Sequence, residues 1–370
     1  MNLSYWEKKS WFSNIDFCVV GSGIVGLNCA IHLKENHPKA KVLVIEKGIL
    51  PQGASTKNAG FACFGSLSEI LDDLRNLSET QLYNLVSERV EGLNILVQTL
   101  GKQKIGYQKH GGYEIFTDRD DDLYADCITN LEAINQLLQP VFKSDIFFLR
   151  EHSFPFNRIK NQCIYNAFEA QIDIGKMMLN LLKAACRKDI IVLNSTSLKS
   201  FDEGNDMVHL KTDDFEFKVG HLFLATNAFT NQLLNLDLKP ARNQVIITSP
   251  IKDLDIQGTF HLDRGYYYFR NIDGRILLGG GRHLDAEKET TAQFGLTQKI
   301  QQHLKDLLEY TILPDQTFKI DMKWSGILGV GPVKEPVVRS VSKRVHCGVR
   351  LGGMGVAIGS SIGRRLAGLV

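Results

Sequence analysis

Three glycines and one glutamate near the N-terminus have the spacing of a nucleotide-binding turn. Gly21, Gly23 and Gly26 form G-x-G-x-x-G directly after an apolar segment and at the start of a helical pattern. The first glycine permits a tight turn, the second lets the backbone approach a pyrophosphate, and the third lets the helix pack against a sheet. Glu46 follows Gly26 by 20 residues, where a carboxylate can bind ribose hydroxyls. This arrangement predicts a dinucleotide site.

The charge of the glutamate restricts which dinucleotide this site accepts. Glu46 would repel a 2′-phosphate, which disfavours NADP. The motif alone does not separate NAD from FAD. The alternative interpretation, a purely structural turn, does not explain why strand, helix, second strand and terminal acid occur together.

The elements around the turn predict a parallel sheet. Residues 15–20 are apolar and β-branched, and apolar residues then recur at helical spacing until Asn36, His37 and Pro38 end the helix. A second strand follows over residues 41–46. Strand, helix and strand within about 30 residues form a βαβ unit, whose two strands are parallel.

The rest of the chain contains further helices and a second set of strands. The patterns predict helices over residues 67–101 and 174–187, and a strand pair in 189–201. β-Branched and aromatic residues are frequent in 243–281, which predicts a separate antiparallel sheet. The C-terminal segment, 345–370, is predicted to be a strand, a glycine turn and a final helix. The fold class expected is α/β, Rossmann-like, with an antiparallel-sheet α+β substrate domain.

Composition and charge narrow the function classes. The 370 residues carry a net charge of only +2, which argues against a nucleic-acid partner. No apolar run approaches the roughly 20 residues of a transmembrane helix, and the N-terminal segment has no secretory pattern. Seven scattered cysteines, never spaced as C-x-x-C, predict reduced thiols in a cytoplasmic protein and no metal site.

Several segments resemble the D-amino-acid oxidase and glycine oxidase superfamily of FAD-dependent enzymes. The segment GASTKNAGF (53–61) resembles the family's "GaSgRNaG", which lies along the pyrophosphate and isoalloxazine. The other matching segments, in family order, are LFLATNAF (222–229), ARNQVIITSP (241–250), YYYFRNIDGRILLGGGR (266–282) and the last 19 residues, GGMGVAIGSSIGRRLAGLV. The resemblance covers the chain from residue 15 to 370 and implies FAD as the cofactor.

The resemblance also implies which residues contact the flavin. Relatives with covalent FAD have a histidine in the segment that matches GASTKNAG, whereas this chain has Thr56 and Lys57 there. Non-covalent FAD is therefore expected. Ser55 and Thr56 could instead be a simple helix N-cap, and the C-terminal glycines a plain capping turn. The expected FAD-binding residues are Gly21, Gly23, Ile24, Gly26, Glu46, Lys47, Ser55, Thr56, Asn58, Ala59, Gly60, Ala225, Thr226, Asn227, Gly352, Gly353, Met354, Gly355 and Val356.

In the family, the FAD domain is assembled from separated stretches. The expected FAD-binding domain comprises residues 1–100, 160–232 and 318–370. The expected substrate domain comprises 101–159 and 233–317.

The substrate side matches the family less well. Amino-acid oxidases have an arginine after a "W-x-G" turn that clamps the substrate carboxylate, but here WSGILGVGP has Ile327 and Leu328. This segment looks more like the γ-glutamylputrescine oxidase branch. Met354 and Ala357 stand where sarcosine oxidases have histidine and lysine, and Leu277 aligns with their oxygen-activating lysine.

The resemblance implies removal of a hydride from the carbon next to nitrogen of a small amine or amino acid, giving an imine that hydrolyses. Tyr266 matches a pocket tyrosine of glycine oxidases, and Arg270 matches the arginine of the family's "PR". Arg350 replaces a usual glycine beside the flavin turn, so it could bind a substrate carboxylate or pair with the flavin, or it could be a surface residue. Strand alternation allows at most Tyr266 and Tyr268 to share a side. The candidate catalytic residues are Tyr266, Arg270, Arg350 and Met354.

Other functions stay open at this point. The electron acceptor could be oxygen, or a quinone or carrier protein in a flavin dehydrogenase. A flavin-binding protein without amine turnover is a second class. An NAD-linked dehydrogenase remains if the resemblance is discounted, and action on a nucleobase in RNA is disfavoured by the charge of +2.

Overall fold

The apolar segment before the glycine turn forms a strand, β1 (Ile15–Val20), in the middle of a largely parallel sheet. This computed structural model describes residues 2–370. β1 pairs in parallel with a strand on each side, and both neighbours continue the parallel arrangement outward. Parallel pairing brings the carboxyl ends of these strands to one edge, where α/β sheets bind ligands. The sheet runs β17 (Val337–Ser340), β18 (Val345–Val349), β11 (Glu216–Leu224), β1, β2 (Val42–Ile45) and β8 (Ile191–Leu193). β10 (Val208–Thr212) also pairs with β11, and β9 (Leu198–Glu203) pairs with β10.

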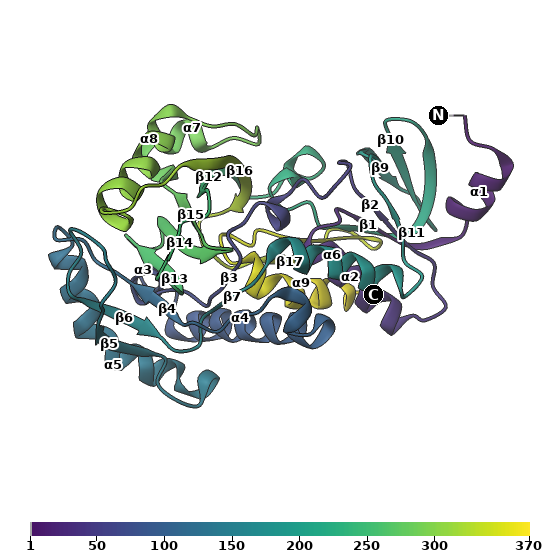
Figure 1. The fold of residues 1–370 in the computed structure, drawn as a ribbon. Coiled ribbons are helices and arrows are strands. Elements are labelled where there is room, and N and C mark those ends of the chain that lie inside the picture. The colour runs from purple at the N-terminus through teal and green to yellow at the C-terminus, as the bar shows by residue number, and fades with distance from the viewer. Residues whose placement is uncertain (1) are drawn as a thin grey trace.

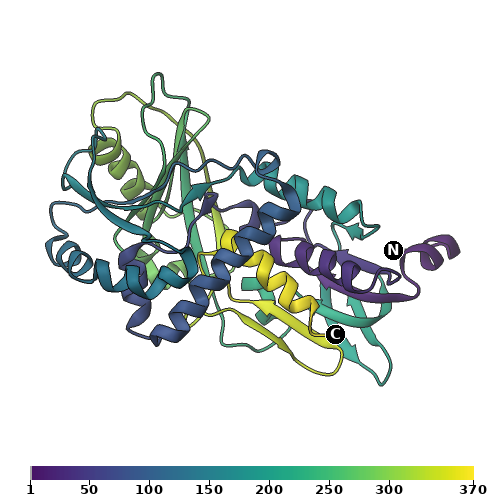
Figure 2. The same ribbon diagram turned by 90° about the horizontal axis from the view of Figure 1, so that it is seen from below.

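The helices packed beside this sheet include the one that follows the glycine turn and the last one of the chain. α2 (Ile24–Asn36) is buried over most of its length, which explains why its apolar residues are not confined to one face. α9 (Gly355–Ala367) lies against both α2 and α4 (Glu79–Leu100), and α6 (Ile174–Cys186) packs on α2 (Figure 2). Segments from the two ends of the chain therefore form one helical layer.

A second sheet of eight strands forms the other end of the molecule (Figure 1). It is mainly antiparallel, but β4 and β13 pair in parallel. Its order is β16 (Ile320–Val330), β12 (Lys239–Thr248), β15 (Arg275–Gly280), β14 (Tyr267–Ile272), β13 (Thr259–Leu262), β4 (Gly112–Glu114), β6 (Gln162–Asn166) and β5 (Phe147–Glu151). The helices at this end are α3 (Leu67–Leu74), α5 (Asp121–Phe142), α7 (Ala286–Glu289) and α8 (Gln298–Leu307).

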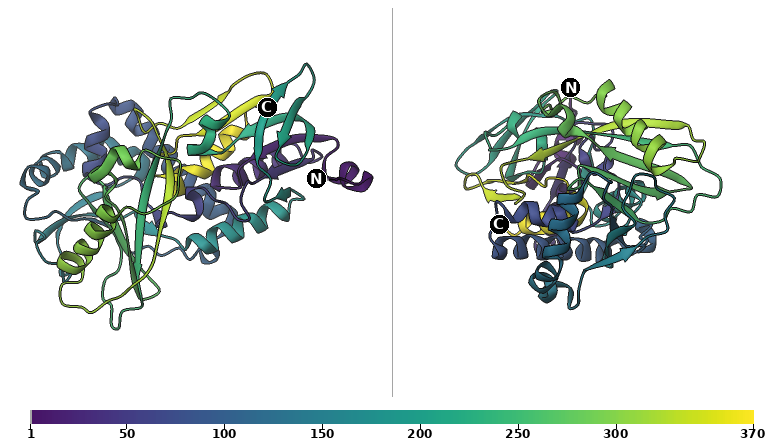
Figure 3. Two further views of the ribbon diagram at one scale, coloured as in Figure 1. Left: turned by 90° about the horizontal axis from the view of Figure 1, so that it is seen from above. Right: turned by 90° about the vertical axis from the view of Figure 1, so that its left-hand side faces the viewer.

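Two smaller elements complete the fold. β3 (Phe61–Ala62) and β7 (Ala170–Gln171) form a two-stranded sheet. The N-terminal helix α1 (Tyr5–Trp11) lies at the periphery, away from the second sheet (Figure 3). Within residues 2–370, no helix combines the length and apolar character required to cross a membrane.

The expected α/β fold class is confirmed, with the βαβ unit, the antiparallel strands of 243–281 and the final strand–turn–helix all present. Sheet membership differs from the expected domain limits at two places. β6 and β16 belong to the second sheet, although the limits at 160 and 318 assign them to the FAD-binding part. Both strands pair along their length with second-sheet neighbours, which places them there.

Candidate functional site

A cavity of about 560 Å³ extends from the glycine turn to the second sheet. Gly21, Gly23 and Glu46 line one end of it, and Tyr266 and Tyr268 line the other. The cavity therefore spans both sheets and is open to a long ligand.

The glycine turn has the close approaches that its spacing predicts. Gly21 has a φ of 103°, a conformation that favours glycine, and its N–H donates to the Ile45 carbonyl at 2.8 Å. A Cβ on Gly26 would stand 1.8 Å from the Gly21 carbonyl oxygen, so only glycine lets α2 begin this close to the turn. The N–H of Ile24 donates to Ser55 Oγ at 3.0 Å, which places the Ser55 hydroxyl at the N-terminus of α2. A diphosphate fits here, because helix N-termini attract anions.

Glu46 is buried at the end of β2, with its carboxylate held by backbone donors. Oε2 accepts the Ser22 N–H at 3.0 Å and Oε1 accepts the Gly48 N–H at 3.1 Å. Oε2 also accepts the Ser22 hydroxyl at 3.2 Å, whereas Oε1 has a second lone pair available for a ligand hydroxyl. Glu46 also lines the cavity, so its position fits the predicted role of binding a ribose.

The loop of residues 53–60 is held in shape by its own side chains. The Asn58 amide donates to the carbonyls of Ala54 and Ser55, both at 3.0 Å, and its oxygen accepts the Gly60 N–H at 2.8 Å. Thr56 Oγ1 donates to the Pro51 carbonyl at 2.7 Å. Thr56 and Gly60 are absent from the cavity lining of the described chain, whereas Ser55, Asn58 and Ala59 belong to it.

The C-terminal turn brings the start of α9 to the same cavity. Asn227, at the end of β11, accepts the Arg350 N–H through Oδ1 at 3.0 Å. A Cβ at Gly352, Gly353 or Gly355 would have no neighbour within 4 Å. These glycines therefore face open space at the N-terminus of a helix. Such an end can stabilise negative charge on a bound group.

The remaining members of the predicted FAD-binding set lie as follows. Within the described residues, Gly26 supports the turn from behind and is absent from the cavity lining, while Lys47 places Nζ 3.9 Å from the ring centre of Phe229. The other predicted residues that line the cavity are Ile24, Lys47, Ala225, Thr226, Asn227, Gly352, Gly353, Met354, Gly355 and Val356.

Arg350 lines the cavity, and its guanidinium contacts backbone carbonyls there. Its φ of 66° lies in the left-handed region, which explains why glycine suits this position. Nε donates to the Glu335 carbonyl at 2.9 Å, and a terminal nitrogen lies 3.4 Å from the Asp237 carbonyl. The guanidinium thus secures the turn, and its predicted role as a carboxylate clamp stays a prediction.

Arg270 lies outside the cavity. It is 2% exposed and is not among the cavity-lining residues of the described chain. Its terminal nitrogen stands 3.1 Å from the position of a Cβ on Gly60, at the end of the loop of residues 53–60. Burial lowers the pKa of Arg270 to about 10, because a buried guanidinium loses hydration. The predicted catalytic role of Arg270 stays a prediction, made for a residue that does not reach the cavity.

The tyrosines alternate as the strand pattern predicts. Tyr266 and Tyr268 line the cavity, while Tyr267 packs into the core of the second sheet. The Asn243 amide donates to the Tyr268 hydroxyl at 3.3 Å, and burial raises the pKa of Tyr268 to about 12. Phe61 meets the Tyr268 ring edge-on at 5.7 Å. This end of the cavity is an aromatic chamber.

Where family oxidases have an arginine, the chamber has apolar side chains. Ile327 and Leu328 both line the cavity. Met354, at the start of α9, receives a contact from the Cys63 thiol at 3.6 Å between the sulfur atoms. Met354 therefore lies at the chamber, as expected, and contacts a cysteine that was not predicted to be there.

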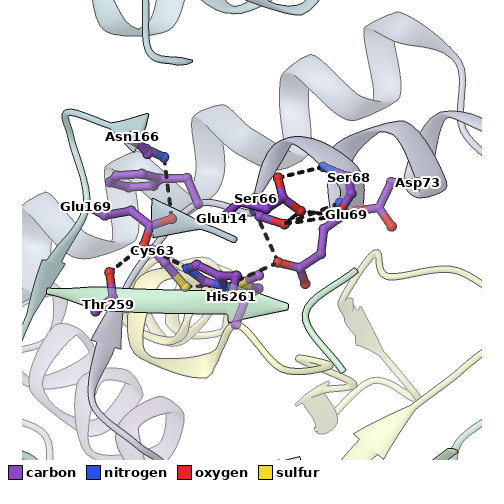
Figure 4. A network of polar contacts seen from close by, with 12 residues as sticks. Cys63, Ser66, Ser68, Glu69, Asp73, Glu114, Asn166, Glu169, Thr259 and His261 are labelled. Carbon is purple, nitrogen blue, oxygen red and sulfur yellow. Dashed lines mark hydrogen bonds and ion pairs between the residues drawn. The ribbon is translucent and has the colours of Figure 1, made fainter. Parts of the chain in front are cut away.

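Sequence reasoning missed an acidic group around one histidine at this end (Figure 4). Glu69 and His261 line the cavity, and Glu114 and Glu169 lie buried behind them. The sequence around both cavity-lining residues indicates structural roles. Ser66 and Glu69 form a capping box, so Glu69 looks like a structural residue. His261 alternates with apolar Phe260 and Leu262 on β13.

Comparisons with known proteins agree with this geometry. The sequence profile of the family described as "FAD dependent oxidoreductase" matches residues 16–369. The chain is 23% identical to "Probable oxidoreductase OrdL" of Haemophilus influenzae, covering 95% of this chain and 82% of that protein.

Solved structures of low sequence identity share the fold. Glycine oxidase from Geobacillus kaustophilus is similar with a TM-score of 0.77 and 17% identity, covering 96% of this chain and 94% of that one. L-Proline dehydrogenase from P. horikoshii has a TM-score of 0.75 and 18% identity, covering 96% and 93%. The glycine turn, the Glu46 carboxylate and the two helix N-termini fit an FAD molecule, and the family match spans nearly the whole chain. The chain therefore belongs to the family of FAD-dependent oxidoreductases.

Proposed function

We propose that this flavoenzyme oxidises the carbon–nitrogen bond of a small amine or amino acid. The observation that carries the proposal is the continuity of one cavity, from the nucleotide-binding turn to an aromatic chamber. The solved structures with this fold include "glycine oxidase" and "L-proline dehydrogenase", which supports the same reaction class. FAD, when bound, supplies the group that accepts a hydride from the carbon next to nitrogen.

The protein's contribution to such a reaction is positioning. Tyr266, Tyr268 and Phe61 surround the chamber and can hold the carbon skeleton, while Ile327 and Leu328 exclude water from one wall. Positioning of a reacting group can supply a large share of the rate enhancement. The reaction balances as R–CH2–NH2 plus oxidised flavin giving R–CH=NH plus two-electron-reduced flavin, and water then converts the imine to a carbonyl compound and ammonia.

The FAD is proposed to be bound without a covalent link. The segment 53–60 contains no histidine, and its side chains Thr56 and Asn58 are engaged with the loop's own carbonyls. Acid or heat denaturation of the purified yellow protein should release the flavin into solution. Flavin that stays with the precipitated chain would contradict this.

The compartment proposed is the cytoplasm. All seven cysteines are free thiols, six of them buried, and reduced cysteines are typical of that compartment. Fractionation of the native host cells, followed by immunodetection, should find the protein with cytoplasmic markers. Recovery with extracytoplasmic markers would overturn the proposal.

The decisive experiment is anaerobic mixing of the FAD-loaded protein with amines, amino acids and N-methyl amino acids. We expect at least one of them to bleach the visible flavin bands. Flavin that stays oxidised with every compound would point instead to a flavin-binding protein without amine turnover.

Oxygen and a quinone remain the two proposed electron acceptors. Once a substrate is found, oxygen uptake and hydrogen peroxide formation should be compared with and without an artificial quinone. Leu277, which replaces the lysine of sarcosine oxidases, is buried and apolar, and this supports slow reaction with oxygen. Fast peroxide formation without the quinone would exclude the dehydrogenase alternative.

A further inference from the structure

One wall of the aromatic chamber contains a buried histidine surrounded by three glutamates (Figure 4). His261 stands on β13, Glu114 ends β4, Glu169 lies between β6 and β7, and Glu69 is in the first turn of α3. We refer to these four residues as the His261 cluster. Only His261 and Glu69 line the cavity among its members.

Both ring nitrogens of His261 face carboxylates. Nε2 lies 2.9 Å from Glu169 Oε2, and Nδ1 lies 3.9 Å from Glu69 Oε2. Burial by itself would lower the pKa of His261, but the neighbouring Glu169 outweighs this and raises it to about 9. The ring therefore faces Glu169 through a hydrogen bond and Glu69 through a longer ion pair.

The two carboxylates behind the wall are already satisfied. Glu169 accepts hydrogen bonds from Thr259 at 2.7 Å and from His261. Glu114 accepts the Ser66 hydroxyl at 3.0 Å and the Ser68 N–H at 3.1 Å. These hydrogen bonds give both buried carboxylates a structural role, and neither carboxylate reaches the cavity surface.

Glu69 differs from them because it faces the cavity and keeps acceptor capacity. Oε2 accepts the Ser66 N–H at 3.1 Å, but none of the described residues donates a hydrogen bond to Oε1. A Cβ on Gly265 would stand 2.5–2.9 Å from the carboxyl atoms of Glu69, so the chain leaves room for this carboxylate. Glu69 is thus held firmly and presents a free oxygen.

Two nearby basic side chains are paired with aspartates: Lys334 Nζ lies 2.8 Å from Asp73 and Arg264 lies 3.5 Å from Asp263. Arg282 lines the cavity beside the tyrosines, with its guanidinium 5.7 Å from the Tyr266 ring centre. Within residues 2–370, no lysine or arginine forms an ion pair with Glu69. The single imidazolium of His261 faces both Glu169 and Glu69, so the cluster holds more carboxylates than one positive charge can balance.

We propose that Glu69 binds a positively charged nitrogen of the substrate, and that the substrate is a diamine. An amine must be unprotonated for its neighbouring carbon to lose a hydride. A nitrogen that is held protonated by a carboxylate therefore serves to anchor the substrate and is not the nitrogen that reacts. A diamine satisfies both needs, with one nitrogen protonated at Glu69 and the other neutral at the flavin. His261 and Glu169 are positioning residues for Glu69. This inference rests on the proposed amine oxidation.

The test compares linear diamines with monoamines and ω-amino acids of equal chain length, using FAD-loaded protein without oxygen. Diamines should bleach the flavin at the lowest half-saturating concentration. In the Glu69→Gln variant this concentration should rise roughly 10–100-fold for diamines, the range expected when a charged hydrogen bond is lost. It should change less than about 3-fold for the matched monoamines. Glu132→Gln, which removes an exposed charge on α5, is the control and should behave as wild type.

A binding measurement separates recognition from turnover. A diamine with two methyl groups on each carbon next to nitrogen has no hydride to give, so it can only bind. It should perturb the flavin absorption spectrum of the wild type, and Glu69→Gln should weaken this binding by a similar factor. Glu69→Asp should restore part of the affinity.

The outcomes distinguish two failures. If no amine or amino acid bleaches the flavin, the proposed amine oxidation fails. If amino acids bleach it better than diamines, or if Glu69→Gln weakens diamines and monoamines equally, the oxidation stands and the role of Glu69 is wrong.

Discussion

At the scale of single residues, the site is organised by carboxylates and amides that hold backbone groups in place. Glu46 receives two backbone N–H groups, and Asn227 receives the N–H of Arg350. The guanidinium of Arg350 in turn donates hydrogen bonds to backbone carbonyls. The same residue types that bind a ligand therefore also build the turns that surround it.

Glu46 offers the sharpest test at this scale. In Glu46→Gln, only one of the two terminal side-chain atoms still accepts hydrogen bonds. The new NH2 group would therefore either face a backbone N–H or replace an acceptor for the ribose hydroxyls. We expect FAD affinity to fall roughly 10–100-fold, about 1.5–3 kcal/mol, measured by quenching of FAD fluorescence on titration. Glu203→Gln, at the far hairpin of the first sheet, serves as control. Equal FAD affinity in Glu46→Gln and wild type would contradict the assignment.

At the scale of elements, the cofactor end depends on two helices that begin at the cavity and pack closely. α2 follows the glycine turn and α9 follows the C-terminal turn. A Cβ on Gly363 of α9 would lie 2.6 Å from Asn28 Cβ and 2.7 Å from the Val25 carbonyl oxygen on α2. The close approach keeps both helix N-termini directed at one ligand.

Gly363→Ala should therefore destabilise the protein through this contact. Overpacking of a buried contact costs about 1–3 kcal/mol, so urea unfolding should show a lower midpoint. Gly368→Ala, at the end of the same helix, is the control, because its Cβ would have ordinary contacts at 3.5 Å and more and φ is −79°. Equal stability of Gly363→Ala and the control would show that α2 and α9 can move apart without cost.

At the scale of the whole molecule, the His261 cluster joins the second sheet to α3. Because the pKa of His261 rises from about 6.5 to about 9 on folding, the folded chain keeps a proton that the unfolded chain releases. The resulting stabilisation is complete below pH 6.5 and is lost as the pH rises toward 9. Glu69, Glu114 and Glu169 are the titratable groups that face the ring.

Unfolding stability should consequently fall by up to about 3 kcal/mol between pH 6.5 and 9. Urea titrations at saturating FAD measure this. The histidines with a lowered pKa, His32, His221, His283, His303 and His346, act below that window and with the opposite sign. His261→Gln should flatten the slope between pH 6.5 and 9, and an unchanged slope would show that another group carries the titration.

The sequence by itself determined the parts of this protein that depend on local spacing. The glycine turn and Glu46 lie within one βαβ unit, and the tyrosines alternate along one strand, so short-range geometry places them. Tertiary structure alone decided where long side chains point and which distant segments meet. Arg350 turns to backbone carbonyls, Arg270 lies at the end of the loop of residues 53–60, and the His261 cluster draws on residues between 69 and 261. Such contacts depend on how the two sheets pack against each other, and a local sequence pattern does not predict that packing.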